Sequence, residues 1–333
     1  MTADHKLRYA PEANRLKAAA SWRPPEVAFW LLAAAAYFLL PRQLVLLSRV
    51  AVMGLFALSL DLILGYGGII TLGHSAYFGT GAYAAGLFAV HLTGEPLLGL
   101  LAGTLAAGLL GLITGAIILR TRGLALLMLT LAITSLCLEV ANKATNWTGG
   151  ADGLGGFTVQ PILGLFKFDF LGKTAYLYCL VVLFACWWLV RRLVYSPFGA
   201  SLTGVRENNV RMHAVGAPVY QRLVVSYTIS AALAGLAGAL LTQTTQFVGL
   251  KVLGFELSGE LMVMLILGGV GRIYGAFVGP LAYLLAQDYL AKQFPEYWYF
   301  GIGTMLVLVV MFARGGILGI VDAVIARLRR ISD

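Results

Sequence analysis

The stretch that decides the fold is LVLLSRVAVMGLFALSLDLIL at residues 44–64, an apolar run interrupted by Arg49 and Asp61. A helix rises about 1.5 Å per residue, so roughly 20 apolar residues cross the hydrocarbon core of a membrane. Nine further apolar runs lie on either side of it, and the full set covers residues 27–40, 44–64, 69–90, 97–119, 124–141, 174–190, 223–248, 257–271, 273–290 and 297–313. These runs are too uniformly apolar for barrel strands, which alternate over about 10 residues. The sequence therefore predicts about ten spanning helices, some of them broken or half-helices because several runs are short.

The composition agrees with a membrane protein. Of the 333 residues, 59% are apolar and only 12% are charged, whereas a soluble domain has about 45–50% apolar and about 25% charged residues. Disordered, disulfide-scaffold, coiled-coil and nucleic-acid-binding classes are excluded on this basis. The sequence predicts an all-α, polytopic transmembrane bundle, and the net charge of +9 is typical of cytoplasmic loops rich in Lys and Arg.

The distribution of basic residues predicts the orientation of the spans. If the N-terminus is cytoplasmic, seventeen Lys and Arg residues fall on the cytoplasmic side and six on the other side, with Arg49 inside a span. The 257–290 region is divided at Arg272, because a single span there would move the basic cluster at 327–330 outside. We therefore expect a cytoplasmic tail at 1–26, a transmembrane domain at 27–313 and a second cytoplasmic tail at 314–333.

Two loops are long enough to have a role of their own. The periplasmic loop at 142–173 carries TGGADG at 148–153, and the cytoplasmic loop at 191–222 carries SPFG at 196–199. After Pro197 the sequence predicts one short helix from about 200 to 215, ended by Gly216. Such a helix suits the docking of a partner, with Leu202 and Val205 on its contact face; the alternative is a solvated basic loop.

The segment GYGGIITLGHSAYFGTGAY at 65–83 places glycines and hydroxyl groups at membrane depth. Polar groups there must be satisfied internally or face water, and broken helices are tolerated where they line protein or a cavity. The segment indicates either a solute pathway or tight packing, and His74 either a structural histidine or a proton relay. The candidate pathway residues are Gly67, Thr71, Gly73, His74, Ser75, Tyr77, Phe78, Gly79, Gly81 and Tyr83.

Enzymatic and metal-binding motifs are missing from the sequence. The Gly-Lys-Thr at 172–174 lacks the first glycine of a phosphate-binding loop, and neither HExxH nor GxSxG occurs in a suitable context. The cysteines Cys137, Cys179 and Cys186 lie inside apolar runs without zinc-type spacing. We expect no catalytic site, cofactor or metal. Intramembrane charges are few (Arg49, Asp61 and Glu139), which disfavours an ion-coupled carrier.

Five motifs in order resemble one family, the M-type permease subunit of branched-chain amino acid ABC importers. Residues 65–83 are similar to its GYTGQLSLGHAAFFGIGAY segment, and 148–154 to TGGxDGL. The other three matches are RTRG at 120–123 followed by TLA at 130–132, the 196–216 region, and 260–279 with its GGVG at 268–271.

The resemblance implies a permease half in a bacterial inner membrane, with ATP hydrolysed by other subunits. Its partners would be two ATP-binding cassette subunits, a second (H-type) permease and a periplasmic substrate-binding protein. It assigns to an ATPase-coupling loop the residues Ser196, Pro197, Gly199, Leu202, Val205, Arg206, Glu207, Asn208 and Gly216. The implied solute is a branched-chain or other hydrophobic amino acid, and the alternatives are urea, short amides or aromatic acids. A stand-alone carrier or channel is the alternative from another class.

Overall fold

The computed structural model describes residues 24–161, 166, 169, 172–312 and 315–320. Within these residues the regular structure is helical, apart from isolated bridge positions, of which Leu154 and Val248 pair with each other in antiparallel direction. The all-α prediction is confirmed. The elements in order are α2 (Pro24–Leu39), α3 (Leu44–Asp61), the π-helix η1 (Leu62–Tyr66), α4 (His74–His91), α5 (Pro96–Ile118), α6 (Leu124–Lys143), α7 (Thr145–Thr148), η2 (Gly150–Asp152), α8 (Lys173–Val194), α9 (Pro197–Glu207), α10 (Asn209–Ala214), α11 (Val219–Thr245), η3 (Leu250–Leu253), α12 (Phe255–Gly268), α13 (Gly275–Gln293) and α14 (Trp298–Phe312).

Each of the ten predicted apolar runs contains a helix. In the described part of the chain, five helical segments are long and apolar enough to cross a membrane: Leu44–Tyr66, Pro96–Ile118, Leu124–Lys143, Lys173–Val194 and Val219–Thr245. The 257–290 region contains two helices, because α12 ends at Gly268 and α13 begins at Gly275. Two glycines between them, Gly269 and Gly271, have positive φ angles, which break the helix.

One predicted span is wrong in its extent. Residues 69–73 are not helical, and α4 begins only at His74. The chain leaves the π-helix at Tyr66, passes Gly68 with φ of +70° and runs without helical geometry to Gly73. Glycine adopts that left-handed conformation without steric cost, so the glycines that looked like part of a span produce the break.

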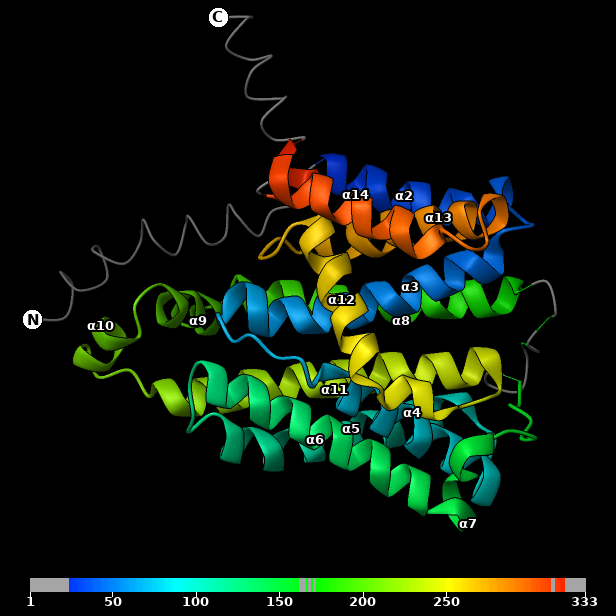
Figure 1. Cartoon of the computed structure of the whole chain (residues 1–333), viewed down its shortest axis with the longest axis horizontal. Helices are drawn as coiled ribbons and strands as arrows, with labels where there is room; N and C mark the ends of the chain where they lie inside the picture. The colour runs from blue at the N-terminus through cyan, green and yellow to red at the C-terminus, as the bar shows by residue number, and fades with distance from the viewer. Residues whose placement is uncertain (1–23, 162–165, 167–168, 170–171, 313–314, 321–333) are drawn as a thin grey trace, which may run out of the picture.

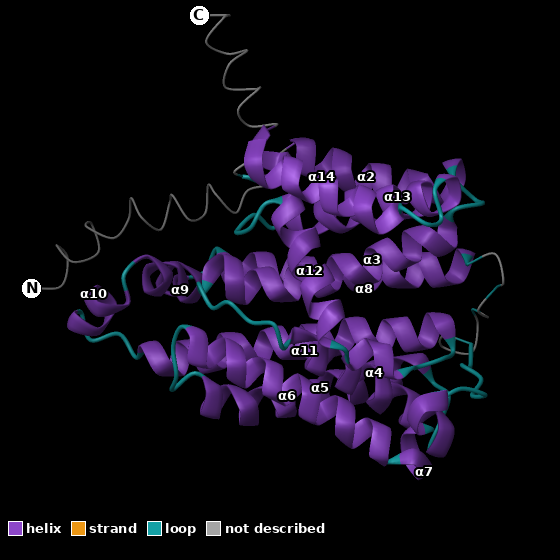
Figure 2. Ribbon diagram, in the orientation of Figure 1, coloured by secondary structure: helices purple, strands orange, loops and turns teal. Residues whose placement is uncertain are grey.

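The helices form a bundle whose centre is α11 (Figure 1). It packs against α5, α4 and α3. In Figure 1, α9 and α10 lie at one end of the bundle and α7 at the other, while α12 crosses in front of the longer helices. Figure 2 shows the loop before α4 running into the middle of the bundle, while the other loops lie toward these two ends. We call these two ends the α10 end and the α7 end.

Small residues set the spacing inside the bundle. A Cβ on Gly81 would collide with the backbone of Gly235, and one on Gly103 would lie 2.7 Å from the Gly81 carbonyl oxygen. The helices α4, α5 and α11 therefore meet backbone to backbone, the usual function of small residues in membrane helices. The outer face of α5, by contrast, exposes large apolar side chains such as Leu105 and Leu109, as expected of a surface that faces lipid.

Candidate functional site

The N-terminal half of α4 contributes buried polar groups to the centre of the bundle. All ten candidate pathway residues, from Gly67 to Tyr83, are buried within this chain. His74 Nε2 lies 2.9 Å from Ser59 Oγ of α3 and 3.4 Å from Ser230 Oγ of α11. The ring of Phe56 stacks on His74 at a centroid distance of 5.7 Å. These contacts fit a structural histidine inside one subunit.

The neighbouring residues of α4 make similar contacts. The Ser75 amide donates to Ser258 Oγ of α12 at 2.8 Å, and Ser258 Oγ donates to Ser75 Oγ at 2.8 Å. Tyr77 Oη lies 2.8 Å from both Thr114 Oγ1 and Tyr227 Oη. The polar groups of the segment thus join α4 to α3, α5, α11 and α12, and buried polar groups in a membrane must be satisfied in this way.

A large cavity opens at the α7 end. Its volume is about 1000 Å³, and Phe78 of α4 is the candidate pathway residue that lines it. Buried Phe78 and Met53 belong to its wall, and charged residues that are exposed or partly exposed surround it. The charged lining residues are Arg42, Arg49, Asp169, Lys251, Asp288 and Lys292. An apolar wall beside charged groups suits a small solute that has an apolar body and ionic ends.

The predicted docking helix is two helices. Ser196 Oγ accepts from the Gly199 amide and Pro197 occupies the first turn of α9, as predicted. The helix then stops at Asn208, whose extended backbone has φ of −155° and whose Oδ1 accepts from the Arg211 amide at 2.9 Å to cap α10. The expectation of one helix over 200–215 is therefore wrong. Asn208 is a preferred N-cap residue and starts a second helix, which ends before Gly216 at φ of +81°.

The contact face of these helices also differs from the expectation. Leu202 and Val205 are 1% and 5% exposed, so they pack against the protein and offer no surface to a partner. The large exposed apolar side chains are Val210 and Val215, at 77% and 78% exposure. Glu207, Asn208 and Arg211 are also exposed. We call Val210, Arg211, Ala214 and Val215 the α10 tip.

Arg206 points inward although its residue is exposed. Its guanidinium donates a hydrogen bond to the carbonyl oxygen of Gly65 in the π-helix. Asp61, the last residue of α3, is fully buried nearby, and its Oδ1 accepts from the Gly271 amide at 2.7 Å. The sequence identified Asp61 as an intramembrane charge. It did not predict the contacts around Asp61, because Arg206 and Gly271 are far from it along the chain.

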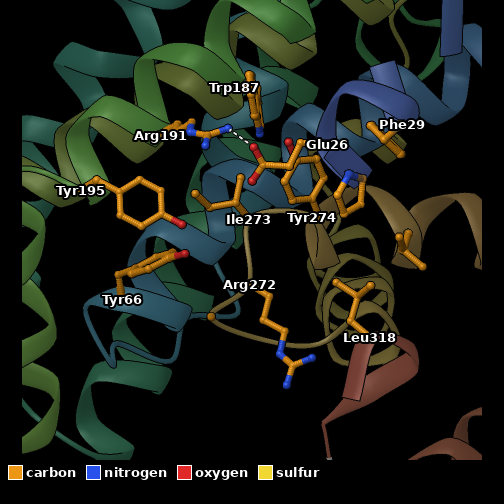
Figure 3. A pocket seen from close by; sticks show the side chains of 13 residues that line it. Glu26, Phe29, Tyr66, Trp187, Arg191, Tyr195, Arg272, Ile273, Tyr274 and Leu318 are labelled. Atoms are coloured by element: carbon orange, nitrogen blue, oxygen red, sulfur yellow. Dashed lines mark hydrogen bonds and ion pairs between the residues drawn. The ribbon is translucent and has the colours of Figure 1, made fainter. Parts of the chain in front are cut away.

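A smaller cavity of about 480 Å³ adjoins this junction at the α10 end. Figure 3 shows the ion pair inside it, where Arg191 Nη1 lies 2.6 Å from Glu26 Oε2. Tyr66 and Tyr195 lie close together on one side, and the guanidinium of Arg272 points away from the ion pair (Figure 3). The ion pair joins the start of α2 to the end of α8, so it holds these two helices together at this end.

The glycine-rich loop at the α7 end is fixed to the segment that follows α11. Gly149, Gly150 and Gly153 have positive φ angles, which explains why this turn needs glycine. Directly after the turn, Leu154 and Val248 exchange two backbone hydrogen bonds of 2.8 and 2.9 Å. The loop therefore ends against the segment that follows α11.

Comparison with known proteins places this architecture. Residues 44–310 match the family model described as branched-chain amino acid transport system / permease component. The high-affinity branched-chain amino acid transport system permease protein LivM of Escherichia coli (strain K12) is 25% identical over 88% of this chain and 74% of its own length. The L-arabinose ABC transporter permease protein AraH of Azospirillum brasilense is 28% identical over 83% of this chain and 80% of its own length.

A shorter match joins the chain to a second type of permease. The high-affinity branched-chain amino acid transport system permease protein LivH of Escherichia coli (strain K12) is 29% identical over 38% of this chain and 41% of its own length. No solved structure matches the chain. The family model covers most of the sequence and contains every helix from α3 to α13. The chain belongs to the permease family of ABC transporters for branched-chain amino acids.

Proposed function

We propose that the chain is one permease subunit of an ABC importer and forms half of a path for a small solute, with ATP hydrolysed by separate subunits. The observation that carries this proposal is the α9–α10 unit together with the family match over residues 44–310. The unit stands at the end of the bundle (Figure 1) and exposes Val210 and Val215. Exposed apolar side chains flanked by charges are typical of a surface that binds another protein.

The proposed partners are two ATP-binding cassette subunits, an H-type permease and a periplasmic substrate-binding protein. The ATP-binding cassette subunits would bind at the α10 tip and the substrate-binding protein at the α7 end. The similarity to both LivM and LivH supports a pair of related permeases. The proposed location is the bacterial inner membrane, with the α10 end in the cytoplasm. Arg120 and Arg122 lie in the α5–α6 loop, which shares this end because α6 runs from there to α7. Basic loops favour the cytoplasmic side.

The proposed solute is a branched-chain or other hydrophobic amino acid, and its proposed place of entry is the large cavity. The apolar side chains of Met53 and Phe78 suit the body of such a solute, while the Arg49 guanidinium suits its carboxylate. The buried hydrogen-bonded residues of α4 lie behind the wall of this cavity. The glycines of α4 therefore act by packing, and Phe78 is the residue of α4 that contacts the solute.

The test is uptake by the complete transporter, purified through a tag on this chain and reconstituted in vesicles. We expect uptake of labelled leucine that requires both ATP and the binding protein. Uptake by this chain alone, driven by an ion gradient, would instead identify a stand-alone carrier. ATP hydrolysis by the isolated chain would contradict the assignment of that activity to separate subunits.

A sugar is the second candidate solute, because the L-arabinose permease protein AraH is 28% identical over 83% of this chain. Labelled L-arabinose belongs in the same uptake assay, beside urea and an aromatic acid. A thermal-shift screen of the copurified binding protein against these compounds decides between them, because only the true solute raises its melting temperature strongly.

A further inference from the structure

Arg206 belongs to the helix that enters the docking loop, yet its side chain reaches back into the membrane domain. Its guanidinium donates to the Gly65 carbonyl. A helix leaves its last carbonyl groups without intrahelical partners, and Gly65 is the next-to-last residue of the π-helix η1. Arg206 therefore supplies a hydrogen-bond donor to a carbonyl group near the end of the helix, where the helix backbone offers no further N–H donor.

The aliphatic part of Arg206 also packs against this region. A Cβ on Gly68 would come within 2.9 Å of Arg206 Cγ and 3.2 Å of its Cβ. The loop that follows the π-helix thus lies directly on the arginine stem. Any displacement of α9 at this point pushes on the loop or pulls on the Gly65 carbonyl.

Asp61 brings a third segment into the same junction. Its Oδ1 binds the Gly271 amide in the α12–α13 loop, and it interacts electrostatically with Arg206. A Cβ on Gly271 would lie 3.2 Å from Arg206 Nη1 and 3.4 Å from the Gly65 oxygen. Three segments therefore meet at one junction: Arg206 of α9 is bonded to Gly65 of η1, and Asp61, at the end of α3, is bonded to Gly271 of the α12–α13 loop.

The junction lies at the π-helix that ends α3. Short π-helical turns are frequent at functional sites. Here η1 continues α3, which packs against α13, α8, α11 and α12. Tyr66, its last residue, also lines the smaller cavity.

We propose that Arg206 is a positioning residue that transmits displacement of α9 to the π-helical end of α3 and to the α12–α13 loop. Arg206 connects the α9–α10 unit to the membrane domain, and the α10 tip connects the same unit to the ATPase. The proposal rests on the proposed function of α9–α10 as the ATPase-docking unit.

The test uses the complete transporter with Arg206→Gln, which keeps a donor but removes the charge and shortens the side chain. The matched control is Arg122→Gln, an exposed arginine at the same end. Three quantities are measured on each: ATPase subunits that copurify with the tagged chain, the rate of ATP hydrolysis, and solute transported per ATP. We expect Arg206→Gln to keep its ATPase subunits and to lose about tenfold in transport per ATP, within the usual range of coupling between sites.

A second comparison, of single and double variants, distinguishes a loss of transmitted displacement from a loss of folding of the chain. We expect Asp61→Asn to lower transport per ATP in the same way, and the double variant Arg206→Gln, Asp61→Asn to be no worse than the poorer single variant, because both act through one junction. We expect Arg122→Gln to match the unaltered transporter.

The remaining outcomes overturn the proposal. Loss of the ATPase subunits from Arg206→Gln would make Arg206 a docking residue. An unchanged transport-to-ATP ratio would make it structural only or without a role, whatever the melting temperature. If the unaltered chain brings no ATPase subunits with it, the proposed function fails instead.

Discussion

At the scale of single residues, glycines decide how closely α4, α5 and α11 approach one another. Small residues of α5 lie four apart in the sequence, a spacing typical of closely packed membrane helices, and the structure has such close contacts at Gly103 and Gly111. The sequence could not assign Arg206 to an interior contact. The direction in which an arginine points depends on where the chain places its acceptor, and Gly65 lies 141 residues away.

Packing at Gly81 gives a first prediction. Gly81→Leu should lower the stability of the purified protein by about 1–3 kcal/mol, because its side chain has no space beside the Gly235 backbone. The measurement is the melting temperature in detergent. Gly303→Leu is the control, since nothing lies near a Cβ there. Equal melting temperatures for the two variants would contradict backbone contact between α4 and α11.

The large cavity gives a second prediction. Arg49→Gln should raise the KM for uptake about tenfold, which corresponds to about 1.4 kcal/mol, because the solute carboxylate loses a charged partner. Lys173→Gln, an exposed cation near the start of α8 outside the cavity lining, is the control. A KM that stays at the unaltered value in Arg49→Gln would remove Arg49 from the solute path.

At the scale of elements, apolar runs predicted the helices well because burial and lipid both demand apolar side chains over a helical length. The two errors have local causes. The glycine-rich turn before His74 shortened one helix, and Asn208 divided another by capping a new one. Periodicity alone also assigned Leu202 and Val205 to a partner, since a buried face and a binding face have the same pattern.

The α10 tip gives a third prediction. Val210→Asp should weaken binding of the ATPase subunits by about 2 kcal/mol, or roughly 30-fold, because a charge replaces an apolar contact. The measurement is the dissociation constant between the membrane subunits and the purified ATPase. We expect a smaller loss for Val210→Thr, which keeps the volume of the side chain. Full affinity in both variants would exclude the α10 tip as the docking surface.

At the scale of the whole molecule, the charge distribution predicts which end faces the cytoplasm. After replacement of Cys137, Cys179 and Cys186, a cysteine at the exposed position Ala214 should react with a membrane-impermeant maleimide only in inverted vesicles. A cysteine at exposed Ala151 should react only in intact spheroplasts. Labelling of Ala214→Cys from the periplasm would reverse the orientation and with it the assignment of both partner surfaces.

The helix α11 connects the two ends of the bundle mechanically. It is 27 residues long, or roughly 40 Å, and runs as one α-helix from the docking loop to the segment that pairs Val248 with Leu154. One continuous helix thus connects the docking loop at one end of the bundle with the glycine-rich turn at the other. We expect a displacement of that turn to shift the docking loop as well, which would couple the two ends of the bundle.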